Sequence, residues 1–312
     1  MKIVFMGTPD FAVPCLRRLI DDGHEIAAVF SQPDRPKGRG YKLVPPPVKE
    51  LALERGLTVL QPTKLRDGVV AEMLRKTRPD AAVVVAYGRI LPLDVLEAPR
   101  LGCINVHASL LPRLRGAAPI QWSIINGDRR TGVTTMHMAE GMDTGDIILQ
   151  RETDIGESET AGELFARLSQ MGAETLSETL GLLEAGGAPR IAQDDSLVTF
   201  APLIGKDMAY LDFTKEPNDL CNLVRGLNPS PMAKMPMGGK LLRVLRARTA
   251  EGSGNPGQIL DPGRFVVACG SGAVELLTVQ PEGKKPMDGG AFIRGLRQPD
   301  QADQAEPGPI SG

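Results

Sequence analysis

The sequence predicts a two-domain α/β protein, with a Rossmann-like domain on a mostly parallel sheet and a second, smaller OB-like β-barrel domain. Three observations support this prediction. The chain has 312 residues, a length typical of about two domains. Its first half alternates short apolar runs with amphipathic stretches, as βαβ units do. Its last third places short β-type runs between Gly and Pro turns, as small barrels do.

The first half predicts strands and helices in alternation. The apolar run at 81–86 is almost continuous, which is typical of a strand covered on both faces. Gly23 would lie just past the end of a helix at 10–22, where glycine accepts the left-handed backbone. The expected strands are 2–6, 25–31, 58–60, 81–86, 102–106, 131–138 and 146–150, and the further helices are 67–77 and 119–125.

A capping box at Thr160 and Glu163 begins a long amphipathic helix that ends at Gly186 and Gly187. A short helix at 217–227 and four β-type runs follow, at 241–247, 257–260, 265–269 and 274–279. We therefore expect a catalytic domain at 1–188, a linker at 189–205, a second domain at 206–297 and a disordered tail at 298–312, which is polar and rich in Pro, Gly and Asp.

Composition limits the class of protein. The net charge of −2 is near balance, so any contact with nucleic acid must come from a local basic patch. The four cysteines lie far apart without a C-x-x-C pair, which favours reduced thiols in a cytosol and argues against a disulfide framework or a zinc site. The apolar run at the N-terminus is too short for a signal peptide or a membrane span. We expect a cytoplasmic protein without metal, membrane or protein partner, acting as a monomer.

The clearest chemical signal is Asn105-Val106-His107 at the end of a predicted strand. Side chains alternate along a strand, so Asn105 and His107 project to one side and Val106 to the other. Ligand sites in open α/β sheets form outside the carboxyl ends of strands. An amide and an imidazole placed there could together bind an oxyanion, although an isolated N-x-H is more often a capped strand end.

A glycine-flanked acidic turn follows later, with Asp143 and Asp146 between two predicted strands. A carboxylate beside His107 would orient its ring and favour the imidazolium form. Spacing alone does not choose between the two aspartates, and both could simply cap a tight turn.

These motifs, in this order, resemble the folate-dependent formyltransferases. The shared elements are the N-x-H, the loop that begins at Ser109 and ends at Gly116, and the acidic turn. The resemblance implies that Asn105, His107 and Asp143 are catalytic and that Asp146 is structural. It implies a formyl donor, 10-formyltetrahydrofolate, held by Ser109, Leu110, Leu111 and Pro112, with the pterin near the backbone of Tyr87, Gly88, Arg89 and Ile90.

Within that family the chain is most similar to members that formylate initiator methionyl-tRNA. The similar segments are 6–12, 32–40, 86–92 and 224–229, so the resemblance covers nearly the whole chain except the tail. It implies that the second domain binds tRNA. One departure is Ser230-Pro231-Met232, where such members commonly carry Trp-Pro-Gly, and we assign these residues no role.

The loop at 31–47 is basic and marked by Gly and Pro turns. Such a loop beside a site suits contact with a phosphate backbone, although on composition alone a solvated surface loop is equally expected. The resemblance favours tRNA, since the matching loop of the tRNA enzymes embraces the acceptor arm. The implied tRNA-binding side chains are Arg35, Lys37, Arg39 and Lys42.

Other functions fit the sequence less well. A nicotinamide-dependent oxidoreductase needs G-x-G-x-x-G after its first strand, and this chain has one glycine, Gly7, in the matching six residues. A purely RNA-binding protein has no use for the Asn-x-His and the acidic turn. Other formyltransferases act on sugar nucleotides or on a purine precursor, but the basic loop and the second domain favour tRNA over both acceptors.

Overall fold

The computed structural model describes residues 1–37 and 41–296, and the chain forms two compact units. The first unit comprises 1–119, 131–153 and 165–201. The second comprises 120–130, 154–164 and the chain from 202 onward. Two short excursions of the first half therefore belong to the second unit. Among the described residues, no helix is long and apolar enough to cross a membrane.

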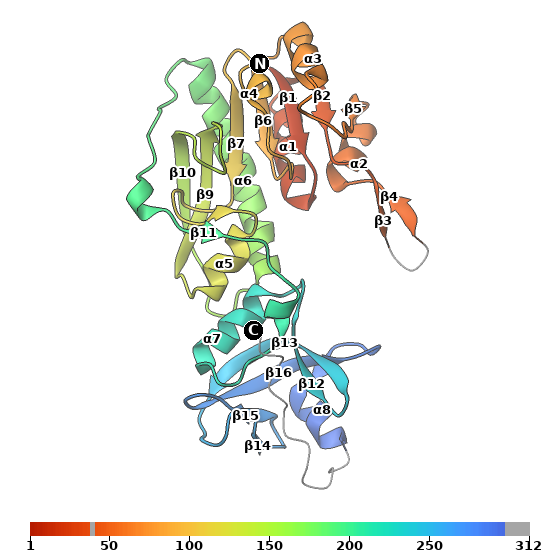
Figure 1. Ribbon diagram of the computed structural model, residues 1–312, viewed down its shortest axis with the longest axis vertical. Coiled ribbons are helices and arrows are strands. Elements are labelled where there is room, and N and C mark those ends of the chain that lie inside the picture. Colours follow the sequence, from red (N-terminus) through yellow and green to blue (C-terminus); the bar gives the residue numbers. More distant parts are fainter. Residues whose placement is uncertain (38–40, 297–312) are drawn as a thin grey trace. The chain divides into compact units, whose positions relative to one another are not determined.

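A seven-stranded sheet forms the first unit (Figure 1). Its strand order is β10-β9-β7-β6-β1-β2-β5, and the five strands from β7 to β5 pair in parallel, while β9 runs antiparallel to β7. The predicted fold class is confirmed. The strands are β1 (Lys2–Gly7), β2 (Glu25–Phe30), β5 (Val59–Leu60), β6 (Ala81–Val85), β7 (Cys103–His107), β9 (Arg130–His137) and β10 (Ile147–Asp154).

Helices cover this sheet because its strands are apolar on both faces. On one face, Gly172 of α6 (Ala161–Glu184) lies against Val106 of β7 and Val133 of β9, so close that a Cβ would crowd Val106. On the other face, α3 (Val69–Thr77) and α4 (Leu93–Leu96) contribute Leu74 and Val95 to a core that includes Cys103. Since Cys103, Asn105 and His107 alternate with Val106, β7 directs its polar residues away from α6.

Several elements of the first unit differ from the sequence expectation. The helix expected at 10–22 is a 3-10 turn, η1 (Asp10–Ala12), followed by α1 (Val13–Asp21), because Pro14 fits only the first turn of an α-helix. The polar stretch after α6 is not fully irregular. It contains η2 (Asp195–Leu197) and β11 (Phe200–Ala201), which pairs in parallel with β8 (Arg115–Gly116). The hairpin of β3 (Arg35–Lys37) and β4 (Lys42–Val44) and the helix α2 (Pro47–Glu54) were not predicted.

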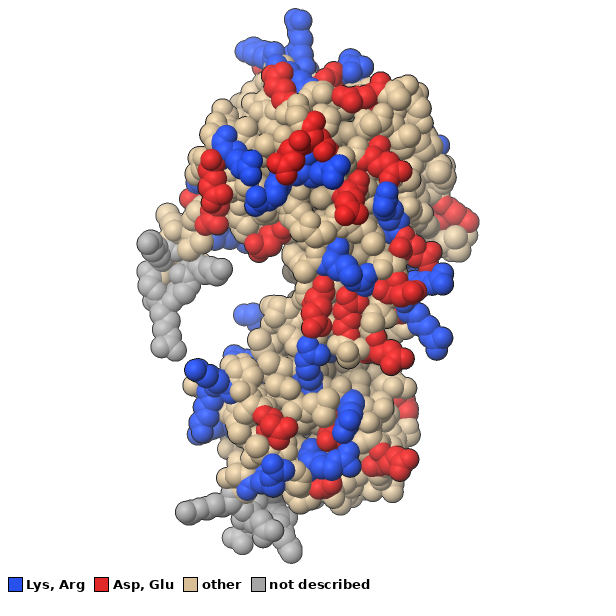
Figure 2. Space-filling model, turned by 180° about the vertical axis from the view of Figure 1, so that it is seen from behind, with Lys and Arg blue, Asp and Glu red and all other residues tan. Residues whose placement is uncertain are grey.

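Charged side chains of both signs are mixed over the face seen in Figure 2, where Lys and Arg alternate with Asp and Glu. This mixture agrees with the nearly balanced net charge of the sequence. A partner that is attracted by charge must therefore find a local group of cations on the surface.

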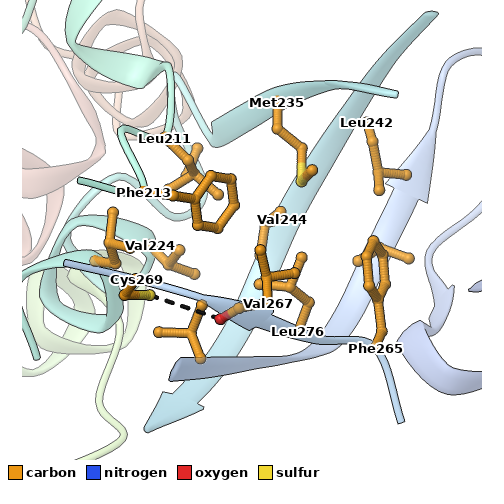
Figure 3. Packing of buried hydrophobic residues seen from close by; sticks show 14 of the residues in the cluster. Leu211, Phe213, Val224, Met235, Leu242, Val244, Phe265, Val267, Cys269 and Leu276 are labelled. Carbon is orange, nitrogen blue, oxygen red and sulfur yellow. Dashed lines mark hydrogen bonds between the residues drawn. The ribbon is translucent and has the colours of Figure 1, made fainter. Parts of the chain in front are cut away.

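The second unit is built on a six-stranded sheet with the order β12-β13-β16-β15-β14, and β17 pairs with β16. Its described pairs are antiparallel. Phe213, Val244, Phe265 and Leu276 are among the side chains that fill its core (Figure 3). The elements are η3 (Asp207–Ala209), α5 (Pro119–Ile125, all but its first residue), α7 (Pro217–Gly226), β12 (Ala233–Met237), β13 (Lys240–Ala250), β14 (Ile259–Asp261), β15 (Val266–Ala268), β16 (Ala273–Pro281), β17 (Met287–Asp288) and α8 (Gly289–Gly295).

Candidate active site

Asn105 and His107 lie in the last three residues of β7, at the carboxyl edge of the parallel strands. Asn105 lies opposite Val84 of β6 and Met136 of β9, so its backbone is fixed on both sides. Its side chain is half-buried, and its Oδ1 is a buried atom without a hydrogen-bond partner in the described structure. A buried polar atom left unpaired is costly, which makes this amide a natural contact for a bound molecule.

The imidazole of His107 is buried and faces an oxygen on each nitrogen. Its Nε2 lies 3.0 Å from the carbonyl oxygen of Leu114. Its Nδ1 lies 3.7 Å from Oδ2 of Asp143. That second distance is an ion-pair distance if the ring is protonated, and it is longer than a good hydrogen bond. The ring is thus held between a backbone carbonyl and a carboxylate.

The structure brings Asp143, and not Asp146, to this histidine. The same Oδ2 of Asp143 accepts a hydrogen bond from the backbone N–H of Gly116 at 2.9 Å. Asp146 instead faces Arg190, with Oδ2 3.4 Å from the guanidinium, and its backbone oxygen accepts from the N–H of His137. The acidic turn needs Gly145, because a Cβ there would overlap the carbonyl oxygen of His137.

His137 lies away from this cluster, at the end of β9, where it pairs with Ile104. Its ring is buried, with Nδ1 3.4 Å from the guanidinium of Arg190. Burial lowers the pKa of His137, and the positive charge of Arg190 lowers it further, while Asp146 opposes the shift. This histidine belongs to the sheet and not to the candidate site.

Thr134 and Gln150 hold the loop that begins at Ser109. The hydroxyl of Thr134 donates to the carbonyl of Ser109 at 2.7 Å and accepts from the N–H of Leu111 at 3.1 Å. The amide of Gln150 donates to the carbonyl of Leu111 at 2.8 Å. Leu110 contacts Gly132 of β9, and Pro112 directly follows Leu111, whose side chain is buried. Sequence reasoning missed both polar residues, since each lies mid-strand without a motif.

A second loop at Tyr87–Ile90 follows β6. Tyr87 is buried in the core, and its carbonyl accepts from Thr8 at 3.1 Å and from Gln32 at 3.2 Å. Gly88 has a φ of +77°, a conformation that favours glycine. Arg89 donates to Gln32 at 3.3 Å. An open hollow of about 710 Å³ lies here, lined by Gln32, Lys64, Leu65, Arg66, Asp67, Gly88, Arg89 and Ile90.

The basic loop forms the β3–β4 hairpin, which pairs with itself as a separate two-stranded sheet. Arg35 is exposed. Arg39 lies outside the described residues, and so do the side chains of Lys37 and Lys42. At the base of the hairpin, Asp34 accepts from Lys49 and from Gln61, each at 2.8 Å. These contacts hold the pKa of the Asp34 carboxyl below its usual value.

Within the ranges that the structure describes, no group of three or more His, Cys, Asp and Glu side chains could hold a metal ion. The cluster at His107 combines an amide, an imidazole and a carboxylate at the edge of a sheet. Such a set can stabilise a negatively charged oxygen and exchange protons, and it contains no serine or cysteine nucleophile.

Two family models match the chain over nearly its whole length. The model described as formyl transferase matches residues 1–180, and the model described as formyl transferase, C-terminal domain, matches residues 203–297. The chain belongs to the formyl transferase family. The family resemblance expected from the sequence motifs is thereby confirmed.

Relatives of this formyl transferase carry a common name. A protein of Geobacter sulfurreducens named methionyl-tRNA formyltransferase is 51% identical over 299 residues, which cover 95% of this chain and 94% of that protein. One of the same name from Clostridioides difficile is 48% identical and covers 95% and 97%. Among solved structures, an N-formyltransferase from Helicobacter canadensis in complex with folinic acid and dTDP-3-aminofucose has a TM-score of 0.66 at 16% identity, with 90% of this chain and 99% of that chain covered. That degree of identity shows a shared fold.

Proposed function

We propose that this formyl transferase moves a formyl group from 10-formyltetrahydrofolate to the amino group of initiator methionyl-tRNA. The observation that carries the proposal is the cluster of Asn105, His107 and Asp143 at the carboxyl edge of β7. The name shared by relatives at 48–51% identity supports the choice of acceptor.

The reaction needs an oxyanion site and no protein nucleophile. The free amine of the acceptor attacks the formyl carbon, a new C–N bond forms, and the former carbonyl oxygen becomes negative. Collapse of this tetrahedral intermediate breaks the bond to the folate nitrogen. A proton leaves the attacking amine, and one is added to the departing nitrogen. Asn105 and His107 would donate to the oxyanion, and each such donor typically contributes about 2.7–4 kcal/mol.

His107 must exchange one contact to play this role. In the structure its Nε2 lies 3.0 Å from the carbonyl of Leu114, on the side opposite the Asp143 contact of Nδ1. A substrate oxygen that takes hydrogen bonds from Nε2 and Asn105 would replace the Leu114 carbonyl. Asp143 would keep the ring oriented during that exchange.

The folate is expected against two loops. Ser109, Leu110, Leu111 and Pro112 would hold it along the loop that Thr134 and Gln150 fix. The backbone of Tyr87, Gly88, Arg89 and Ile90 would surround the pterin, because main-chain N–H and C=O groups match the donor and acceptor edge of such a ring.

The tRNA is expected at basic surfaces. Arg35, Lys37, Arg39 and Lys42 would contact phosphates from the β3–β4 hairpin. In the second unit, Lys206, Lys234 and Arg243 line a hollow of about 310 Å³ that also contains Glu282. Lys234 lies 4.1 Å from the centre of the Tyr210 ring. We propose the domain at 206–297 as a tRNA-binding domain, after a catalytic domain at 1–188 and a linker at 189–205, in a monomeric cytoplasmic enzyme.

One assay tests the function. Purified protein is given 10-formyltetrahydrofolate with methionyl-tRNA, with free methionine or with an amino-sugar nucleotide, and the formylated product is measured. Of the three acceptors, we expect only methionyl-tRNA to be formylated, and we expect His107→Ala to lower the rate. Preferential formylation of the sugar nucleotide would show that the acceptor is wrongly assigned.

A further inference from the structure

The segment between α6 and the second unit holds the proposed catalytic groups in place. Gln193 lies on this segment, and its side-chain amide donates to the carbonyl of Asp143 at 2.8 Å and to the carbonyl of Gly145 at 2.8 Å. One side chain thus ties down both sides of the acidic turn, from a point 50 residues away in sequence.

Gln193 is itself fixed by Arg115. The guanidinium of Arg115 donates to Oε1 of Gln193 from Nε at 3.0 Å and from a terminal nitrogen at 2.8 Å. Arg115 is buried and also pairs with Asp195 at 3.2 Å. With its oxygen occupied by two donors, the amide of Gln193 can present only its NH₂ group to the acidic turn.

The same segment supports the opposite side of His107. The N–H of Leu114 donates to the hydroxyl of Thr199 at 2.9 Å, and the N–H of Arg115 donates to the carbonyl of Thr199 at 2.9 Å. Gly116 packs so tightly on Ala201 of β11 that a Cβ would meet the Ala201 carbonyl. Leu114 and Gly116 are the residues whose backbones contact His107 and Asp143.

The turn requires such support because Asp143 has a φ of +55°, in the left-handed region that residues other than glycine rarely adopt. Conformations of this kind persist where surrounding contacts impose them. If the turn relaxed, the carboxylate would move relative to a ring that is already 3.7 Å away.

We propose that Gln193 is a positioning residue for formyl transfer, which holds Asp143 at His107 through the acidic turn. This inference rests on the proposed function, since it assumes that Asp143 and His107 act in the reaction. Gln193 touches the turn and needs no contact with substrate.

The test uses two substitutions with different chemistry. Gln193→Ala removes the whole clamp. Gln193→Glu keeps an oxygen for Arg115 and replaces the NH₂ donor by a second oxygen that faces two carbonyls. The control is Gln170→Ala, at an exposed position of α6. Rates are measured in the full-length protein with 10-formyltetrahydrofolate and methionyl-tRNA varied separately, and thermal unfolding is followed for each variant.

We expect both Gln193 variants to lose about 10- to 100-fold in kcat, because a small misplacement of a positioned group is costly, while both KM values change less than about twofold. The Gln170→Ala variant should match the wild type. If Gln193→Glu restored full activity, Gln193 would only be a partner for Arg115, and the inference would be wrong. A wild-type kcat in Gln193→Ala would also overturn the inference. So would a loss of kcat/KM in Gln193→Ala that comes from a raised KM and not from a lowered kcat.

A double variant separates this inference from the proposed function. If Gln193 acts through Asp143, the variant Asp143→Asn/Gln193→Ala should be about as slow as Asp143→Asn alone, whereas fully additive losses would contradict the coupling. Full activity in Asp143→Asn and His107→Ala would refute the catalytic roles and the positioning role together. Loss in those two variants with full activity in Gln193→Ala would refute the positioning role alone.

Discussion

The acidic turn and the basic hairpin of the first unit are built in opposite ways. The turn at Asp143 is held by hydrogen bonds from Gly116 and Gln193, and its Gly145 packs directly against the backbone of His137. The hairpin pairs only with itself in the described sheets, and two of its side chains, Tyr41 and Leu43, are 81% and 61% exposed. The difference is instructive because a group that acts in a transition state must be fixed in advance, whereas a contact with a polyanion depends chiefly on charge.

The largest effect should come from the two residues proposed to donate to the oxyanion. We expect His107→Ala and Asn105→Ala each to lower kcat by about 10²- to 10³-fold, with folate affinity nearly unchanged, because these donors act mainly in the transition state. Steady-state rates and a binding titration with the folate would measure this. Turnover near the wild-type value in either variant would show that the assigned role is wrong.

The acidic turn should show a clear contrast between its two aspartates. Asp143→Asn keeps the size of the side chain and removes the charge that lies 3.7 Å from His107, so we expect a strong loss of kcat. Asp146→Asn is the matched control, since Asp146 faces Arg190 instead. Equal losses of kcat in the two variants would contradict the pairing of Asp143 with His107.

The hairpin should show an intermediate effect of a different kind. Replacing Arg39 or Arg35 by Ala should raise the KM for methionyl-tRNA several-fold and leave the KM for the formyl donor nearly unchanged. Each lost phosphate contact should also flatten the log–log dependence of tRNA affinity on salt by about 0.7 to 0.9. Kinetics at two salt concentrations measure both, with Arg75→Ala as the control, since Arg75 lies near Lys2 at the amino end of β1. A variant that lost folate binding and kept its tRNA kinetics would show that this loop contacts the folate and that its assignment to tRNA is wrong.

The smallest effect should be one of stability at the other end of the sheet. Because burial lowers the pKa of His137, its contribution to stability is present above its unfolded pKa of about 6.5 and is lost as the pH falls through its lower folded pKa. The wild type should therefore lose more thermal stability between pH 7 and pH 5 than His137→Gln does. His24 is common to both proteins and cancels in the comparison. Parallel Tm curves over this range would contradict the assignment.

The sequence predicted the parts of the site that depend on local pattern. The alternation of Asn105, Val106 and His107 along one strand, and the position of that strand's carboxyl end, follow from strand geometry. The family followed from three motifs in order. The choice between Asp143 and Asp146 did not follow from residue pattern, because it depends on the loop conformation, including the positive φ of Asp143.

Long-range polar contacts were the least predictable part. Gln193 and Thr134 carry no motif, and their importance comes from hydrogen bonds to backbone groups 50 and 25 residues away. The stretch around Gln193 is polar and shows no helix or strand pattern, so the sequence predicts a linker there. Its short strand, β11, consists of two residues and exists only because β8 offers an edge to pair with.

The position of Gln193 also limits where this protein can be cut. A chain ending after α6, at Glu184, would keep Asn105, His107 and Asp143 and would lose the glutamine that clamps the acidic turn, along with β11. The family model for the first part of the chain ends at residue 180, before any of these contacts. A fragment meant to keep the acidic turn clamped should therefore extend at least through Ala201. Exchanging the connecting segment for one without this glutamine should lower activity, even though none of the proposed catalytic residues lies on it.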